Sequence, residues 1–179
     1  MSRKKLWLII LLVFVIALGV MGYKLLGPFM EGRSYYYSHT NFTDLSNESI
    51  GKMRLHDNID KEVFRKEYGE PIRKIDNVYY DYYYWKNGVE TASIMEGKEK
   101  GKIVRLIIGE NIDLKTEKGI GIGSTKQDVI SSYGPNYYER TEQGATIIGY
   151  ADHNLHITIE FWLGEGKIAL IRLDDADVE

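Results

Sequence analysis

The sequence contains no cysteine, only three prolines and only four histidines. Without cysteine the chain can form no disulfide bond and cannot be processed as a lipoprotein, so any folded part depends on its hydrophobic core alone. The chain also lacks the His-Glu-x-x-His motif of metalloproteases, the Gly-x-Ser-x-Gly motif of serine hydrolases and a phosphate-binding glycine loop. We therefore expect no enzymatic activity and no bound cofactor.

The scarcity of histidine also bears on metal binding. Only His153 and His156 lie near each other in the sequence. A metal site would need both imidazoles on one side, together with further ligands. Because His153 falls in a predicted turn and His156 at the start of a predicted strand, we interpret the pair as part of a hydrophilic hairpin and predict no metal site.

Acidic residues outnumber basic ones, and the excess lies after residue 26. The chain has 23 basic and 26 acidic residues. Residues 1–26 hold four of the basic residues and none of the acidic ones, which leaves 19 basic against 26 acidic residues in 27–179, a net charge of −7. An acidic surface disfavours nucleic acid and anionic lipid headgroups. We predict no nucleic-acid partner, while a basic protein or peptide partner and a plainly solvated acidic face both stay open.

One long hydrophobic run lies near the N-terminus, from Leu6 to Met21, and reaches 18 residues if it is extended to Tyr23. About 20 apolar residues cross a bilayer core of ~30 Å. Basic residues precede the run, so the positive-inside rule predicts a cytoplasmic N-terminus and an extracytoplasmic remainder. A cleaved signal peptide is the alternative. We predict that residues 1–26 form a cytoplasmic stub and a single-pass transmembrane helix in the cell membrane, followed by a linker at 27–50.

A segment near the middle of the chain recurs close to its end. Gly101–Ile108 is similar to Gly166–Leu173, and the offset between them equals the offset between Tyr68-Gly69 and Tyr133-Gly134. We call this common offset, from Gly101 to Gly166, the repeat spacing. Two landmarks with one spacing indicate two copies of one structural unit. After the anchor and linker, we predict a first repeat at 51–110, a connector at 111–118, and a second repeat with an acidic tail at 119–179.

Each repeat is predicted to contain a helix followed by an antiparallel meander, an α+β fold. In the first repeat, Asp57 or Asn58 is a candidate helix cap and Gly69 a C-terminal stop. In the second, Ser124 is the candidate cap and Gln127 stands at capping-box spacing. The predicted strands are 78–85, 89–95 and 102–108 in the first repeat, with an Asn87-Gly88 hairpin turn, and 145–150, 155–163 and 167–173 in the second.

Alternation along the closing strands predicts which residues face the core. The predicted core set is Val104, Leu106 and Ile108 in the first repeat, aligned with Ala169, Ile171 and Leu173 in the second.

The second repeat opens with a motif that resembles a known superfamily. Ile120–Val129 followed by Tyr133-Gly134-Pro135 is similar to the opening shared by the β-lactamase inhibitory protein and the small lipoproteins of the outer-membrane β-barrel assembly machinery. The resemblance covers residues 51–175 and implies tandem units of helices on four-stranded sheets, as in the inhibitory protein. It implies a binding scaffold and no catalytic residue. The chain departs from the pattern at Leu55–Asn58, where the glycine-rich opening is missing, and in having no disulfides.

Tyrosines dominate one predicted strand. Alternation sends Tyr80, Tyr82 and Tyr84 to one face, and Tyr79, Asp81, Tyr83 and Trp85 to the other. If a sheet is covered on one face only, one of these rows is at least partly exposed. Trp162 poses the same question, because it alternates with Ile157, Ile159 and Phe161 and shares the outer face with Glu160.

These aromatic residues allow two interpretations. Tyrosine simply suits strands, or the row is a recognition surface that offers a large contact area with polar tips. We select Tyr80, Tyr82, Tyr84, Trp162 and Glu160 as candidate partner-binding residues. The predicted function is a membrane-anchored, extracytoplasmic binding protein without catalytic activity, which presents its sheet to a protein or cell-envelope partner. A structural or assembly role in an envelope complex is the alternative.

Overall fold

The computed structural model describes residues 3–30, 32–109 and 113–178, and within the first helix it describes the side chains of Trp7 and residues 11–23. The chain divides into two compact units, Met1–Tyr36 and Tyr37–Glu179. The start of the predicted connector, residues 111 and 112, lies outside the described residues.

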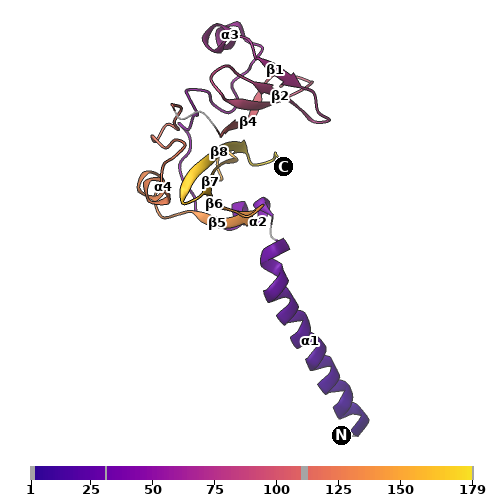
Figure 1. The fold of residues 1–179 in the computed structure, drawn as a ribbon. Helices are drawn as coiled ribbons and strands as arrows, with labels where there is room; N and C mark the ends of the chain where they lie inside the picture. The colour runs from indigo at the N-terminus through magenta and orange to yellow at the C-terminus, as the bar shows by residue number, and fades with distance from the viewer. Residues whose placement is uncertain (1–2, 31, 110–112, 179) are drawn as a thin grey trace. The chain divides into compact units, whose positions relative to one another are not determined.

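Helix α1 (Arg3–Met30) makes up most of the first unit, and α2 (Arg33–His39) begins in it (Figure 1). Among the described residues, no helix combines the length and the apolar character that a membrane crossing requires. The uncharged run from Leu6 to Tyr23 has 18 residues, which at ~1.5 Å per residue covers about 27 Å of a ~30 Å hydrocarbon core. The predicted transmembrane anchor is therefore wrong, and so is the single-pass location with a cytoplasmic N-terminus.

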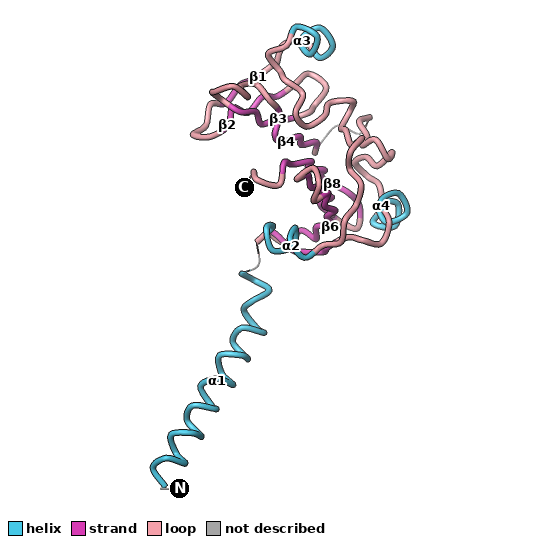
Figure 2. The backbone as a smooth tube through the Cα atoms, turned by 180° about the vertical axis from the view of Figure 1, so that it is seen from behind, coloured by secondary structure: helices cyan, strands magenta, loops and turns pink. Residues whose placement is uncertain are grey.

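The second unit is built on one antiparallel sheet of eight strands (Figures 1 and 2). The strands are β1 (Arg73–Ile75), β2 (Tyr80–Tyr84), β3 (Glu90–Ile94), β4 (Ile103–Ile108), β5 (Tyr138–Glu142), β6 (Ala145–Asp152), β7 (Ile157–Gly164) and β8 (Lys167–Asp175), in the order β1-β2-β3-β4-β8-β7-β6-β5. The predicted fold of a transmembrane helix and two tandem meander units is wrong. The closing strands β4 and β8 pair with each other and join both meanders into a single sheet.

The two closing strands share one irregularity. In β4, Val104 is an extra residue relative to β3, and in β8, Ala169 is an extra residue relative to β7. The two bulges are separated by the same repeat spacing that relates the two glycine-led segments in the sequence. A bulge shifts the alternation of side chains. Both residues were predicted to face the core, but Val104 lies on the opposite face and Ala169 is exposed, while Ile103 and Ile168 are buried instead.

The main hydrophobic core lies on one face of the sheet, which we call the inner face. Helices α3 (Glu62–Tyr68) and α4 (Lys126–Tyr133) pack there against strand residues such as Leu106 and Phe161. Leu45 and Ile50 are also buried in this core, so part of the segment expected to be a linker belongs to the folded unit. The opposite side, which carries Tyr82, is the outer face.

The helix caps differ from the predicted ones by a few residues. Helix α4 begins with a complete capping box, but Thr125 is the N-cap and Asp128 its partner, in place of Ser124 and Gln127. The Ser124 hydroxyl accepts a hydrogen bond from the backbone N–H of Gly121 in the preceding turn. The N-cap of α3 is Lys61, without a side-chain cap, so neither Asp57 nor Asn58 caps that helix. Short polar side chains compete for turn and cap positions, which sequence spacing alone does not separate.

Lys52 occupies a backbone position that favours glycine. Its φ is 70°, and Gly119, which also precedes a buried apolar residue at the end of a turn, has a φ of 83°. For a residue with a Cβ this region costs ~1 kcal/mol or more. Lys52 is exposed, so we expect Lys52→Gly to raise the free energy of unfolding by about 1 kcal/mol, measured by urea denaturation. Lys52→Ala keeps the Cβ and is the control. Equal stability of the two variants would show that the position is unstrained.

Candidate functional site

The register places all five candidate binding residues on the outer face. From β2 to β7 the successive cross-strand partners are Tyr82, Ala92, Arg105, Asp174 and Thr158, and side chains at alternate positions of each strand share that face. Tyr80 and Tyr84 flank Tyr82, and Glu160 and Trp162 follow Thr158 in β7. The aromatic row that contains Tyr83 and Trp85 points to the inner face, where Trp85 is buried in the core. The role of the five residues in binding stays a prediction.

Glu160 lies at the centre of an ion-pair network on β5 to β8. Arg140 donates from Nε and Nη2 to its two carboxylate oxygens at 2.9 Å each, and Arg172 donates from Nη2 at 2.6 Å. The Tyr138 hydroxyl donates to Oε1 at 2.7 Å. Burial alone would raise the pKa of Glu160, but the hydrogen bond from Arg140 and the charges of Arg172 and Arg140 outweigh it and lower that pKa to about 2. With 1% of its surface exposed, Glu160 is enclosed by its own chain.

The network continues toward the first half of the sheet. Arg172 Nε lies 3.0 Å from Asp174 Oδ2, close enough for an ion pair but without the alignment of a hydrogen bond. On the other side, Arg105 Nε donates to Asp174 Oδ1 at 2.6 Å, and its Nη2 reaches the backbone oxygen of Val178 at 3.3 Å. Charges of opposite sign thus alternate from Arg140 to Arg105, across β5, β7, β8 and β4.

Trp162 belongs to the same network. The guanidinium carbons of Arg140 and Arg172 lie 5.9 Å and 5.4 Å from the centre of its ring, within the range of cation–π attraction. Its indole nitrogen is buried and has no hydrogen-bond partner among the described residues. Trp162 is half-buried, and its ring contributes to holding the two arginines.

Gly149 makes the network possible at β6. A Cβ at this position would lie 2.0 Å from Cζ and 2.3 Å from the hydroxyl of Tyr138. The Tyr138 ring therefore lies directly over the glycine of the neighbouring strand, which lets its hydroxyl reach Glu160 one strand further on. Only glycine accommodates such a close approach.

The half of the outer face over β1 to β4 has a different character. Tyr80, Tyr82 and Tyr84 are half-buried, and the first two pack with Ile94 against a small cluster that contains Val104. In the segments that precede β1 and β2, Ile72, Val78 and Tyr79 are also strongly exposed, at 71%, 77% and 77%. This half presents partly exposed aromatic and aliphatic surface in place of a closed ion-pair network.

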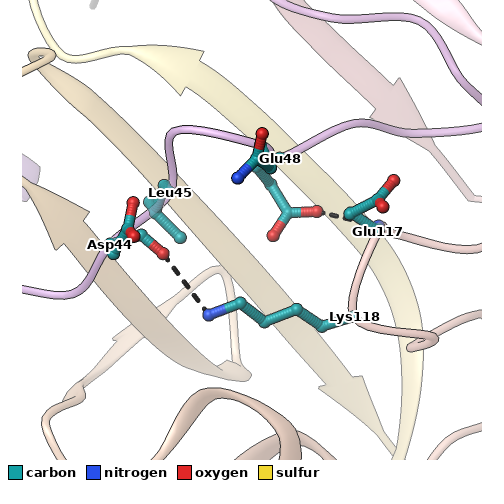
Figure 3. A pocket seen from close by; sticks show the side chains of 6 residues that line it. Asp44, Leu45, Glu48, Glu117 and Lys118 are labelled. Atoms are coloured by element: carbon teal, nitrogen blue, oxygen red, sulfur yellow. Dashed lines mark hydrogen bonds between the residues drawn. The ribbon is translucent and has the colours of Figure 1, made fainter.

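A separate pocket of about 120 Å³ lies beside the chain segment 44–48 (Figure 3). At its edge the Glu48 carboxylate accepts hydrogen bonds from the backbone N–H groups of Ser49 and Glu117 at 3.1 Å and 3.0 Å, and from the Tyr133 hydroxyl at 2.8 Å. Burial raises the pKa of Glu48, and these three donors oppose the rise. Lys118 Nζ lies 3.3 Å from the carbonyl oxygen of Asp44.

The residues around the pocket serve to connect segments of the fold. The three donors to Glu48 come from its own loop, from the connector and from α4, so the carboxylate ties these segments together. The residues that line the pocket are Asp44, Leu45, Asn47, Glu48, Glu117 and Lys118. None of them is a histidine, serine or threonine that Glu48 could activate as a base.

The described residues contain no group of three or more His, Asp or Glu side chains that could hold a metal ion. His153 Nε2 lies 2.8 Å from the carbonyl oxygen of Thr40, and its ring packs against Tyr37. His156 lies in the turn with a φ of 55°.

Sequence reasoning missed the arginines that enclose Glu160. Arg140 and Glu142 stand two residues apart on β5, and Arg172 and Asp174 stand two residues apart on β8, so each pair shares a face of the sheet. Opposite charges at a spacing of two were a signal that could have revealed them, but residues 138–142 were not among the predicted strands. No family model, curated protein or solved structure matches this chain, so the resemblance to the β-lactamase inhibitory protein superfamily stays a prediction that depends on its motifs alone.

Proposed function

We propose that the chain is a protein-binding module without catalytic activity, and that it binds through the tyrosine face. We define the tyrosine face as the outer-face residues Tyr80, Tyr82, Tyr84, Ile94 and Ile107. The observation that carries the proposal is a row of three tyrosines at alternate positions of β2, each of which is only half-buried.

The chemistry of these side chains supports a protein partner. Tyrosine combines a large apolar ring with a hydroxyl, and it is enriched among residues that dominate binding energy at interfaces. Burial and nearby Glu90 raise the pKa of Tyr84 above its ordinary value. The two candidate residues in the closed half, Glu160 and Trp162, are committed to the arginines and are not part of the proposed interface.

The location of the interface is tested by photo-crosslinking in cells. A benzophenone amino acid in place of Tyr80 should crosslink to a discrete protein partner. The same amino acid in place of Lys66, an exposed residue of α3 away from the outer face, is the control. Equal crosslinking from both positions, or from neither, would remove the tyrosine face as the binding site.

The partner identified in this way then allows affinity to be measured. We expect Tyr82→Ala to weaken binding by about 30-fold, since a residue at a binding hot spot contributes ~2 kcal/mol or more. Val63→Ala is the matched control, because Val63 is 77% exposed but lies on α3. Both variants should unfold cooperatively in urea. If Tyr82→Ala destabilises the fold as severely as a truncation at Leu106 in the core, the tyrosine is a packing residue and the proposal fails.

A further inference from the structure

The two halves of the sheet have corresponding glutamates on the outer face. Glu90 in β3 is paired with Tyr84 on one side and Ile107 on the other. Glu160 in β7 is paired with Gly149 and Arg172. The repeat spacing separates Tyr84 from Gly149 and also Ile107 from Arg172. Glu90 and Glu160 therefore stand at the same place in the two halves.

The two carboxylates differ in their cations. Glu160 is neutralised by Arg172 of the next strand and by Arg140 of β5. The positions that precede these two arginines by the repeat spacing are Ile107 and Ile75, whose side chains have no charge. The first half therefore keeps the carboxylate and lacks both of the guanidinium groups that enclose it in the second half.

Among the described residues, no cation forms an ion pair with Glu90 in the way that Arg140 and Arg172 do with Glu160. Arg105 forms its ion pair with Asp174, and the guanidinium of Arg73 lies over the Tyr84 ring at 5.0 Å from its centre. Burial raises the pKa of Glu90 above its ordinary value. The hydrogen bond with Tyr84 and the charges of Arg105 and Arg73 oppose this rise but do not cancel it. Glu90 is half-buried, so its carboxylate is still accessible from the outer face.

We infer that Glu90, with the rings of Tyr82 and Tyr84 beside it, receives the guanidinium group of an arginine that the protein partner presents. The inference depends on the proposed function and names the chemistry of its partner. A planar guanidinium can donate two hydrogen bonds to a carboxylate while it stacks on an aromatic ring, which the ammonium of lysine cannot do. The chain itself uses this combination at Glu160, where both arginines also lie against Trp162.

The probe for this site is arginine blocked at both ends, N-acetyl-arginine methylamide, titrated into the full-length protein. Binding is followed by the ¹³C shift of the Glu90 carboxylate in the unchanged protein, and by the ring ¹³C shifts of Tyr84, the cross-strand partner of Glu90, in the unchanged protein and in every variant. Blocked citrulline, the neutral isostere, is the matched control probe. We expect a saturable shift with the arginine probe and an affinity for citrulline that is weaker by about tenfold or more, since a charge-assisted bond contributes ~1.5–3 kcal/mol.

Three variants decide whether Glu90 is responsible. Glu90→Gln should abolish binding of the arginine probe. Ile107→Arg places a guanidinium at the position of Arg172, so it should occupy the site from within the chain and abolish binding as well. Glu139→Gln removes an exposed carboxylate on β5, paired with Lys126, and should bind as the unchanged protein does.

Several outcomes would overturn the inference. They are equal shifts with arginine and citrulline, unchanged binding by Glu90→Gln, and no shift of the Glu90 carboxylate at the highest probe concentration. The proposed function would survive any of these results, provided that crosslinking from position 80 still captures a partner. If Glu90→Gln captures that partner with undiminished affinity, the tyrosine face binds by another chemistry.

Discussion

Glu160→Gln is expected to lower the free energy of unfolding at pH 7 by about 3 kcal/mol. The pKa of this carboxyl falls from its ordinary value of 4.5 to about 2 in the folded protein, and each pKa unit corresponds to ~1.4 kcal/mol. Glutamine has nearly the same shape, but it removes the buried carboxylate that Arg140 and Arg172 share and leaves them only Glu142 and Asp174 as counter-charges. Breaking a buried ion pair by removal of one partner typically costs ~3–5 kcal/mol, which agrees with this value.

The loss should depend on pH in a defined direction. The pKa of Glu160 is lowered on folding, so its stabilisation is complete above about pH 4.5 and is lost as the pH falls toward about 2. The difference between the unchanged protein and Glu160→Gln should therefore narrow from pH 7 to about pH 3. Urea unfolding at both pH values measures it. Glu139→Gln is the control, because its partner Lys126 is on the surface and the pair contributes little. A difference that stays constant with pH would show that folding does not change the pKa of Glu160.

The position of Glu160 also shows what alternation along a strand can and cannot predict. The period of two placed Glu160 and Trp162 on the face opposite Phe161, and the structure has them there. Alternation gives the face of a residue but not its neighbours across the sheet. Arg140 lies 20 residues before Glu160 in the sequence and Arg172 lies 12 residues after it. The network therefore exists only once the four strands β5 to β8 have assembled in the sheet.

Local signals predicted turns better than they predicted the sheet. Gly69, the predicted C-terminal stop of its helix, has a positive φ and donates a backbone hydrogen bond to the carbonyl oxygen of Arg65, four positions earlier. Gly134 closes α4 in the same way with a bond to Ile130. The pairing of β4 with β8 joins residues such as Leu106 and Leu173, which are far apart in the chain. No local pattern specifies that partner, because both strands are apolar enough to pair with several others.

The main errors also have physical causes. Val104 was assigned to the core by strict alternation, and a one-residue bulge moved it to the outer face. The bulge is invisible in composition, since β4 is apolar on both faces of the sheet, with Ile103 and Leu106 on the inner face and Val104 and Ile107 on the outer face. The hydrophobic run was judged long enough at 18 residues from Leu6 to Tyr23, although that length is marginal for a bilayer.

Phe161→Ala is expected to cost about 3–5 kcal/mol of stability, among the largest losses available in the core. Phe161 is fully buried on the inner face. The centre of its ring lies 5.1 Å from that of Tyr133 in α4 and 6.4 Å from that of Tyr150 in β6. Truncation to alanine removes the edge-on contact with both rings and leaves a cavity between the helix and the sheet. Urea denaturation measures the loss, and Phe161→Leu, which fills part of the space, should lose clearly less.

The same variant separates folding from binding, since the ring lies on the face of the sheet opposite the tyrosine face. Under conditions in which Phe161→Ala is still folded, crosslinking from position 80 and binding of the arginine probe should match those of the unchanged protein. Tyr82→Ala should give the reverse result, with weak binding and a smaller loss of stability. If Phe161→Ala loses binding while it is still folded, the two faces of the sheet are coupled, and a recognition surface independent of the core is excluded. If Ala and Leu at position 161 lose equal stability, the loss comes from the missing ring contacts with Tyr133 and Tyr150, and the cavity contributes little.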